Sequence, residues 1–158
     1  MAWSASKIFR AMLADALGNV AAIDLDADTL KVALYDNDIT PDANVTAANS
    51  AYNAGQWTSA GNEVFEAGQW AQGGVALAGQ SLNSAINDTV FLDANDTASG
   101  SAADLANVFG CLVYDDTIAA PVADQGICYN YFGGSNSVVN GTLTVVWNAL
   151  GILRYTHT

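Results

Sequence analysis

The chain has 158 residues, of which 51% are hydrophobic and 13% charged, so it can bury a core of its own and disorder of the whole chain is excluded. Sixteen acidic residues face four basic ones, for a formal net charge of −12. Nucleic acid is therefore not an expected partner, because its binding requires clustered lysine and arginine. Nor is a membrane, because no apolar stretch approaches the roughly 18 residues of a spanning helix.

Residues 4–17 predict an amphipathic helix. Ile8 and Met12 begin one apolar row, while Phe9 and Leu13 begin the adjoining row at a spacing of four. This helix could pack on its own domain or on a neighbouring subunit. The predicted organisation is an N-terminal helix or arm over residues 1–20 and a β-sandwich domain over residues 21–158.

Residues 29–36 predict a half-buried strand, because larger apolar side chains occupy alternate positions of LKVALY. Thr40 and Pro41 then match the cap and first position of a short helix, which ends before Gly55. From residue 55 to residue 79, glycines separate short apolar pieces. This spacing favours an all-β sandwich or barrel.

The tetrapeptide AGQW occurs twice, at residues 54–57 and 67–70. One recurrence does not define a repeat architecture. We expect Trp57 and Trp70 to anchor adjacent hairpins, and large aromatic side chains are also common at the centre of protein interfaces.

The second half of the chain is predicted to form mostly strands. Residues 88–99 predict a strand and a polar turn, residues 102–109 a helical turn or an irregular edge, and residues 111–114 a buried strand. With GGSN as a turn, the last third predicts a β-meander of three strands, over 127–132, 142–147 and 151–155.

The sequence contains few of the residue patterns that form catalytic sites, so an enzyme is not expected. The only histidine, His157, is the penultimate residue of the sequence, which argues against Ser-His-Asp or Cys-His catalysis. Asp115 and Asp116 are adjacent and would point to opposite faces of a strand, while Glu63 and Glu66 lie in the glycine-rich region. We interpret these acids as solvated surface and expect no catalytic residue and no cofactor.

Asp24, Asp26 and Asp28 share the spacing of a calcium loop. Thr29 stands where an EF-hand has its turn glycine, and Tyr35 where it has its bidentate glutamate, so this is not an EF-hand. Two interpretations stay open: a looser calcium site, or a charged strand entrance that discourages edge pairing. No metal ligand set is assigned.

Cys111 and Cys128 lie 17 residues apart without a CxxC motif or a histidine pair, which excludes a zinc site. A disulfide is possible, but a reduced, buried pair is favoured for a protein made in the cytoplasm. Asp15 interrupts the apolar run after Lys7 and Arg10, so the N-terminal sequence does not match a secretory signal peptide.

Four segments, taken in order, resemble a family of small tailed-phage virion proteins. They are DTLKVALYD (28–36), NEVFEAGQWAQGGVALAG (62–79), GCLVYDDT (110–117) and YFGGSNSVVNGTLTVVWNALGILR (131–154). Phe65 and Glu66 depart from the glycine-rich pattern of the family, and residues 37–53 form a longer stretch than it has. The resemblance implies a non-enzymatic, β-rich structural protein of the minor capsid or head decoration type.

The expected fold is mainly β, an antiparallel β-sandwich or jelly-roll-like domain with an N-terminal α-helix. The expected function is to bind the outside of a tailed-virus capsid and stabilise the shell, with the major capsid protein and copies of the same chain as partners. The alternatives are a tail, baseplate or fibre component, or a carbohydrate-binding or adhesive β-module. The candidate partner-contact residues are Lys7, Phe9, Arg10, Leu13, Trp57 and Trp70. Lys7 and Arg10 carry half of the basic charge, which suits an acidic capsid surface. Truncating residues 1–17 is then expected to abolish capsid binding and leave a folded β domain.

Overall fold

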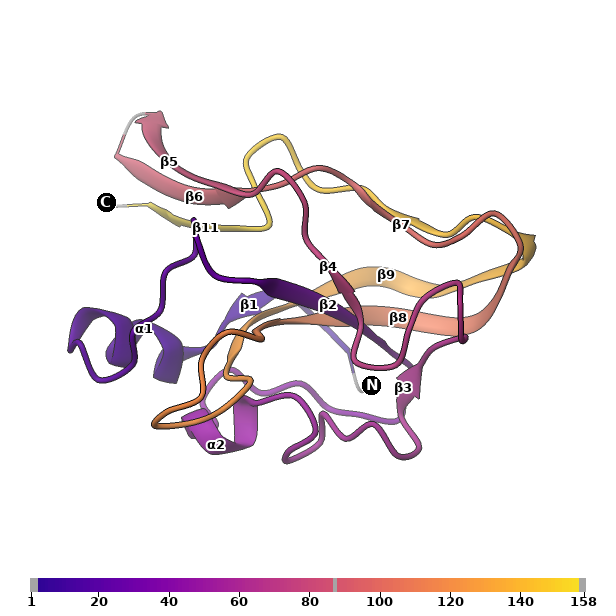
Figure 1. Cartoon of the computed structure of the whole chain (residues 1–158), viewed down its shortest axis with the longest axis horizontal. Helices are drawn as coiled ribbons and strands as arrows, with labels where there is room; N and C mark the ends of the chain where they lie inside the picture. The colour runs from indigo at the N-terminus through magenta and orange to yellow at the C-terminus, as the bar shows by residue number, and fades with distance from the viewer. Residues whose placement is uncertain (1–2, 87, 157–158) are drawn as a thin grey trace.

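The computed structural model describes residues 3–86 and 88–156 (Figure 1); His157 lies outside the described residues. The elements in chain order are β1 (Lys7–Ile8), α1 (Arg10–Leu17), β2 (Leu30–Tyr35), α2 (Ala47–Ser50), β3 (Glu63–Val64), β4 (Val75–Ala76), β5 (Ser81–Ile86), β6 (Thr89–Asp93), β7 (Thr97–Ala98), β8 (Ala103–Asp115), β9 (Gly126–Gly141), β10 (Thr144–Val145) and β11 (Leu153–Thr156). The protein is mainly β with antiparallel sheets, which confirms the expected fold class. Neither described helix is long and apolar enough to cross a membrane.

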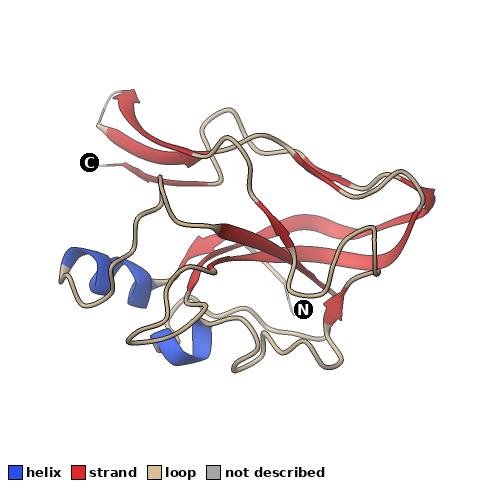
Figure 2. Ribbon diagram, viewed as in Figure 1, coloured by secondary structure: helices blue, strands red, loops and turns tan. Residues whose placement is uncertain are grey.

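The strands form a large sheet and two small ones. The six-stranded sheet has the order β1-β9-β8-β2-β3, with β4 also paired to β2. The small sheets are β11-β6-β5 and β10-β7. Figures 1 and 2 place both small sheets on one side of the large sheet, and α2 with its flanking loops on the other. The arrangement is sandwich-like, with an additional layer of loops and helix.

Strand β2 is buried on both faces, so the prediction of a half-buried strand is wrong. Val32 and Leu34 face one side and Ala33 and Tyr35 the other, and all four side chains are inaccessible to solvent. The layers on both sides of the large sheet explain this burial. Only Lys31 keeps partial exposure within this strand, and its ammonium group forms an ion pair with Asp116.

An aromatic cluster fills the space between the large sheet and the loop layer. Trp57 lies at its centre, with ring centroids 5.2 Å from Tyr35, 5.9 Å from Trp3 and 6.0 Å from Phe9. These contacts are edge-to-face, a favourable geometry for aromatic pairs. The Tyr35 hydroxyl also donates a 2.8 Å hydrogen bond to the Trp57 carbonyl oxygen.

The predicted helix over residues 4–17 begins only at Arg10. The Phe9 amide donates to the Ile127 carbonyl at 3.1 Å and the Arg10 amide to the Ala43 carbonyl at 3.0 Å. These tertiary hydrogen bonds hold the preceding residues, Lys7–Ile8, in a strand that pairs with β9. Helix periodicity therefore yields to sheet pairing in the first part of the segment.

The N-terminal segment is not a separate arm. Trp3, Phe9 and Met12 belong to the same core cluster as the sheet residues. The Trp3 indole donates a 2.6 Å hydrogen bond to the Asp36 carbonyl oxygen, across the large sheet from β1. Truncation of residues 1–17 would open this core, so the expectation of an intact β domain after truncation does not fit the packing.

The predicted β-meander is also wrong. Strand β9 continues through GGSN, while β10 pairs with β7 and β11 pairs with β6. Between the pairs Gly110–Tyr131 and Val108–Asn136, β8 advances two residues and β9 five. This bulge absorbs the two glycines that suggested a turn. On the opposite strand, residues 103–109 belong to β8 rather than to a helical turn.

The helix predicted to start at Thr40 is shorter and later. Helix α2 spans Ala47–Ser50, and the Thr46 side chain caps it by accepting a hydrogen bond from the Asn49 amide. The asparagine- and threonine-rich sequence around it has low helix propensity, which agrees with a single turn.

Gly110 tests the aromatic packing. A Cβ added at this position would lie 2.5 Å from the Asn130 carbonyl oxygen and 2.6 Å from the Trp3 ring. We expect Gly110→Val to lower the free energy of unfolding by about 1–3 kcal/mol or more, through overpacking. Urea denaturation measures this change. Ala106→Val, at an exposed position of the same strand, should shift it by no more than about 0.5 kcal/mol; equal effects of the two variants would contradict this packing.

Candidate partner-binding groove

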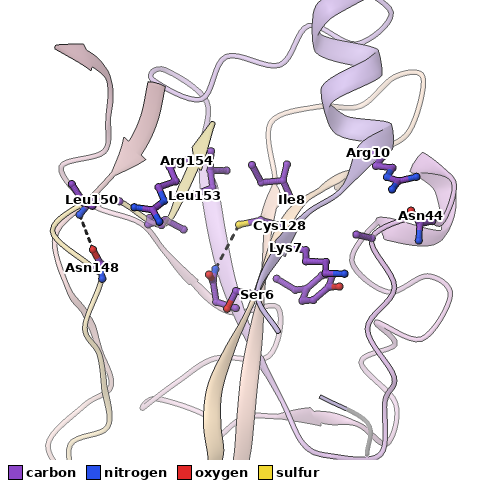
Figure 3. A pocket seen from close by; sticks show the side chains of 15 residues that line it. Ser6, Lys7, Ile8, Arg10, Asn44, Cys128, Asn148, Leu150, Leu153 and Arg154 are labelled. Carbon is purple, nitrogen blue, oxygen red and sulfur yellow. Dashed lines mark hydrogen bonds between the residues drawn. The ribbon is translucent and has the colours of Figure 1, made fainter. Parts of the chain in front are cut away.

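A groove of about 710 Å³ lies at the open edge of the large sheet (Figure 3). Its lining comes from four segments that are distant in sequence: the chain around β1, residues 43–44, residues 128–130 of β9, and residues 148 and 150–154 leading into β11. The groove therefore lies where the large sheet and the three-stranded sheet come together.

Both strands that border the groove are edge strands. β1 ends the order of the large sheet and β11 ends that of the three-stranded sheet. The Phe9 amide bonds to β9, and alternate residues of an antiparallel strand face alternate sides. The N–H and C=O of Ile8 therefore face away from β9. No strand of the described chain pairs with this side of β1.

Three of the four basic residues line the groove: Lys7, Arg10 and Arg154. All three side chains are exposed. The fourth, Lys31, is paired with Asp116 at 2.8 Å, and no ion pair within the described chain involves the other three. A protein of net charge −12 thus concentrates its available positive charge at one place.

The two sides of the β1 edge differ in character. Figure 3 shows Lys7 and Arg10 on one side of the edge, and Arg154 with Leu150 and Leu153 on the other. Ile8 pairs with Cys128 and faces opposite to Lys7, because neighbouring residues of a strand alternate. One side is therefore cationic and hydrophilic, and the other combines apolar side chains with a single cation.

The structure separates the six candidate contact residues into exposed, partly buried and fully buried groups. Lys7 and Arg10 are exposed in the groove. Phe9, Trp57 and Trp70 have no exposed surface, so the prediction that they contact a partner is wrong.

Leu13 is partly buried and packs against the core. The Trp70 indole donates a 3.1 Å hydrogen bond to the Val32 carbonyl oxygen, which places it inside the fold. Arg154 was not predicted as a contact residue from the sequence. The one sequence feature that could have indicated it is that the chain has only four basic residues, of which Arg154 is one.

A second groove of about 670 Å³ adjoins the first and shares five lining residues with it: Ser6, Asn130, Asn148, Gly151 and Ile152. Its lining combines aliphatic side chains with aromatic side chains, amides and hydroxyls, among them Tyr131, Phe132, Asn136, Ser137 and Trp147. The Trp147 indole donates to the Thr97 hydroxyl at 3.3 Å, which fixes the orientation of its ring.

The acids at the entrance of β2 form a hydrogen-bonded turn. Asp24 Oδ1 accepts from the amides of Asp26 and Ala27, and Asp26 Oδ1 accepts from the Leu82 amide at 2.7 Å. Within residues 3–86 and 88–156, no group of three or more potential ligands could hold a metal ion. The arrangement favours the interpretation of a charged strand entrance.

Two of the acids predicted as solvated surface are buried. Glu63 accepts hydrogen bonds from the Tyr52 hydroxyl at 2.8 Å and the Gly73 amide at 2.7 Å, and burial raises its pKa. Asp115 is fully buried, and its Oδ1 accepts from the amides of Thr117 and Ile118. These carboxyl groups organise loops from the inside of the fold.

Cys111 and Cys128 are both buried and not joined by a disulfide, as favoured from the sequence. Cys128 is among the residues that line the groove. Burial nevertheless raises the pKa of its thiol to about 12. The groove floor is therefore not a reactive thiol site.

No protein-family model, curated protein or solved structure matches this chain. The geometry of the groove and the sequence resemblance are therefore the observations on which a function can be proposed.

The ionisation of Asp115 makes the free energy of unfolding depend on pH. Its burial, together with the nearby Asp28 carboxyl, raises the pKa of Asp115 to about 7, against an ordinary value of 3.8. The folded state then binds this proton more tightly than the unfolded state, so the stabilisation is complete below about pH 4 and is lost as the pH rises to about 7. We expect the unfolding free energy to fall across this interval.

Asp115→Asn keeps the oxygen that accepts from Thr117 and Ile118 but cannot ionise. Its unfolding free energy should fall less steeply than that of the wild type between pH 4 and pH 7, as measured by urea denaturation at several pH values. Asp96→Asn, at an exposed position, is the matched control and should keep the wild-type slope. Parallel curves for Asp115→Asn and the wild type would contradict the assignment.

Proposed function

We propose that this protein is a structural component of a tailed-virus particle, which binds the outside of the capsid as a minor capsid or decoration protein and stabilises the shell. The observation that carries the proposal is the gathering of Lys7, Arg10 and Arg154 in one groove on an otherwise acidic chain. Such a surface suits docking on an acidic partner in one orientation, because charge complementarity fixes register and disfavours wrong partners.

The remaining charge also suits this role. An excess of acids keeps unassembled copies apart in solution and makes packaged nucleic acid an unfavourable partner. The ordered resemblance to tailed-phage virion proteins supplies the identity of the partner, the major capsid protein. Binding in many copies would bring neighbouring chains together on the lattice, so self-association on the shell is part of the proposal.

Co-sedimentation with empty shells prepared without this protein tests the function. We expect saturable binding at a copy number proportional to the number of capsomers. Changing Lys7 and Arg10 together to Gln should weaken binding about tenfold or more, and added salt should weaken the wild type.

Lys31→Gln is the matched control for a single charge change, compared with Lys7→Gln and Arg154→Gln. It removes one positive charge away from the groove and breaks only an ion pair whose side chains are partly exposed, which contributes about 0–1 kcal/mol to stability. Its binding should stay within about twofold of the wild type. Equal losses in the control and in the groove variants would contradict docking through the groove.

Copy number separates the head from the tail. Binding of only a few copies per particle, at a vertex or on tails, would assign the protein to a tail, baseplate or fibre position. No binding to shells or tails would contradict the virion proposal as a whole.

The second groove favours one other function, a carbohydrate-binding β-module. Aromatic faces beside amides and hydroxyls, here Tyr131, Phe132, Trp147 and Asn136, can stack on sugar rings and bond their hydroxyls. In this case a glycan array would give selective binding and the ligand would quench Trp147 fluorescence, while Trp147→Phe would weaken binding. Trp70→Phe, in the core, is the control for the loss of an indole. An array without selective binding would contradict this function.

A further inference from the structure

We propose that the groove binds an extended acidic segment of the shell protein as an additional strand on the outer edge of β1. This inference rests on the proposed function, because it names the kind of segment through which the shell is bound. It adds main-chain hydrogen bonding to the charge attraction already proposed for the groove.

The edge of β1 provides the main-chain groups. The Ile8 N–H and C=O face away from β9 and have no partner strand in the described part of the chain. Unpaired edges of this kind template the addition of an extended chain. Beyond Phe9 the edge is closed, because the Arg10 amide bonds to the Ala43 carbonyl. The added strand therefore lies alongside residues 6–8.

Alternation along the added strand gives its side-chain pattern. Residues that face the Lys7 side meet two cations, Lys7 and Arg10, while residues that face the other side meet Ile8, Leu150 and Leu153. A segment that alternates acidic and apolar residues complements both sides, because successive side chains of a strand point to opposite faces. A further acid at the end nearest Arg154 would complete the match.

The charge of the chain decides against other occupants. A nucleic acid would bring its phosphates beside a protein of net charge −12, with only three cations to receive them. In a second copy, the densest acidic segment is the turn at residues 24–28, and it is already held by internal hydrogen bonds that would have to break before it could pair as an extended strand. The shell protein's segment is the occupant that agrees with both observations.

A synthetic peptide tests the inference without the shell. The probe is an acetylated and amidated peptide of about six residues, the common length of a strand, with alternating Glu and Val and a fluorescent label. Anisotropy titration against the whole protein should show saturable binding. A peptide of the same composition, with its Glu and Val residues in two blocks, should bind about tenfold more weakly.

Two N-methylated forms of the probe separate strand pairing from simple charge attraction. Each is methylated on one of the two alternate sets of amides, so the charge and side chains are unchanged. One set must face β1, and its methylation should weaken binding about tenfold or more, because it removes main-chain donors. Lys7→Gln should also weaken binding, whereas Lys31→Gln should not.

The outcomes distinguish this inference from the proposed function. Binding that is indifferent to both N-methylated forms, or that an oligonucleotide of equal charge displaces equally well, overturns strand addition. Failure of the peptide with retained binding to shells overturns it too, and leaves docking through side chains. Failure of both the peptide and the shells contradicts the inference and the proposed function together.

Discussion

The burial of Trp3 and Phe9 against the large sheet is the interaction on which the groove depends. Trp3 reaches across the sheet to the Asp36 carbonyl, and Phe9 packs on Trp57. Together they hold the intervening residues against β9, so that β1 forms at all. Without these two anchors, nothing in the short Lys7–Ile8 strand would fix the position of Lys7.

This placement brings the positive charge and the open edge of β1 to the same part of the molecule. Residues 3–8 bring Lys7 to the edge, α1 begins with Arg10, and the last strand brings Arg154 to the same place. A single positive region on an acidic protein gives orientation, and an open edge gives a means of main-chain recognition. The aromatic side chains contribute by holding the scaffold rather than by touching a partner.

The sequence predicted the class of fold and the cationic N-terminal contribution, but not the site. β2 and the buried part of β8 were readable from local patterns, because apolar and β-branched residues cluster there. Arg154 was not, because its proximity to Lys7 arises from sheet pairings between segments at opposite ends of the sequence. The same non-local pairing turned part of an amphipathic helix into β1, and the burial of Trp57 and Trp70 depended on layers that no local pattern reveals.

The most direct measurement is hydrogen–deuterium exchange of the protein with and without empty shells. Docking by strand addition predicts that protection on binding is strongest at Ile8 and extends over residues 6–10 and 148–154, while the aromatic core is unchanged. Protection centred on the exposed bulge of β9 or on the turn at residues 24–28, with unchanged exchange at Ile8, would contradict the account.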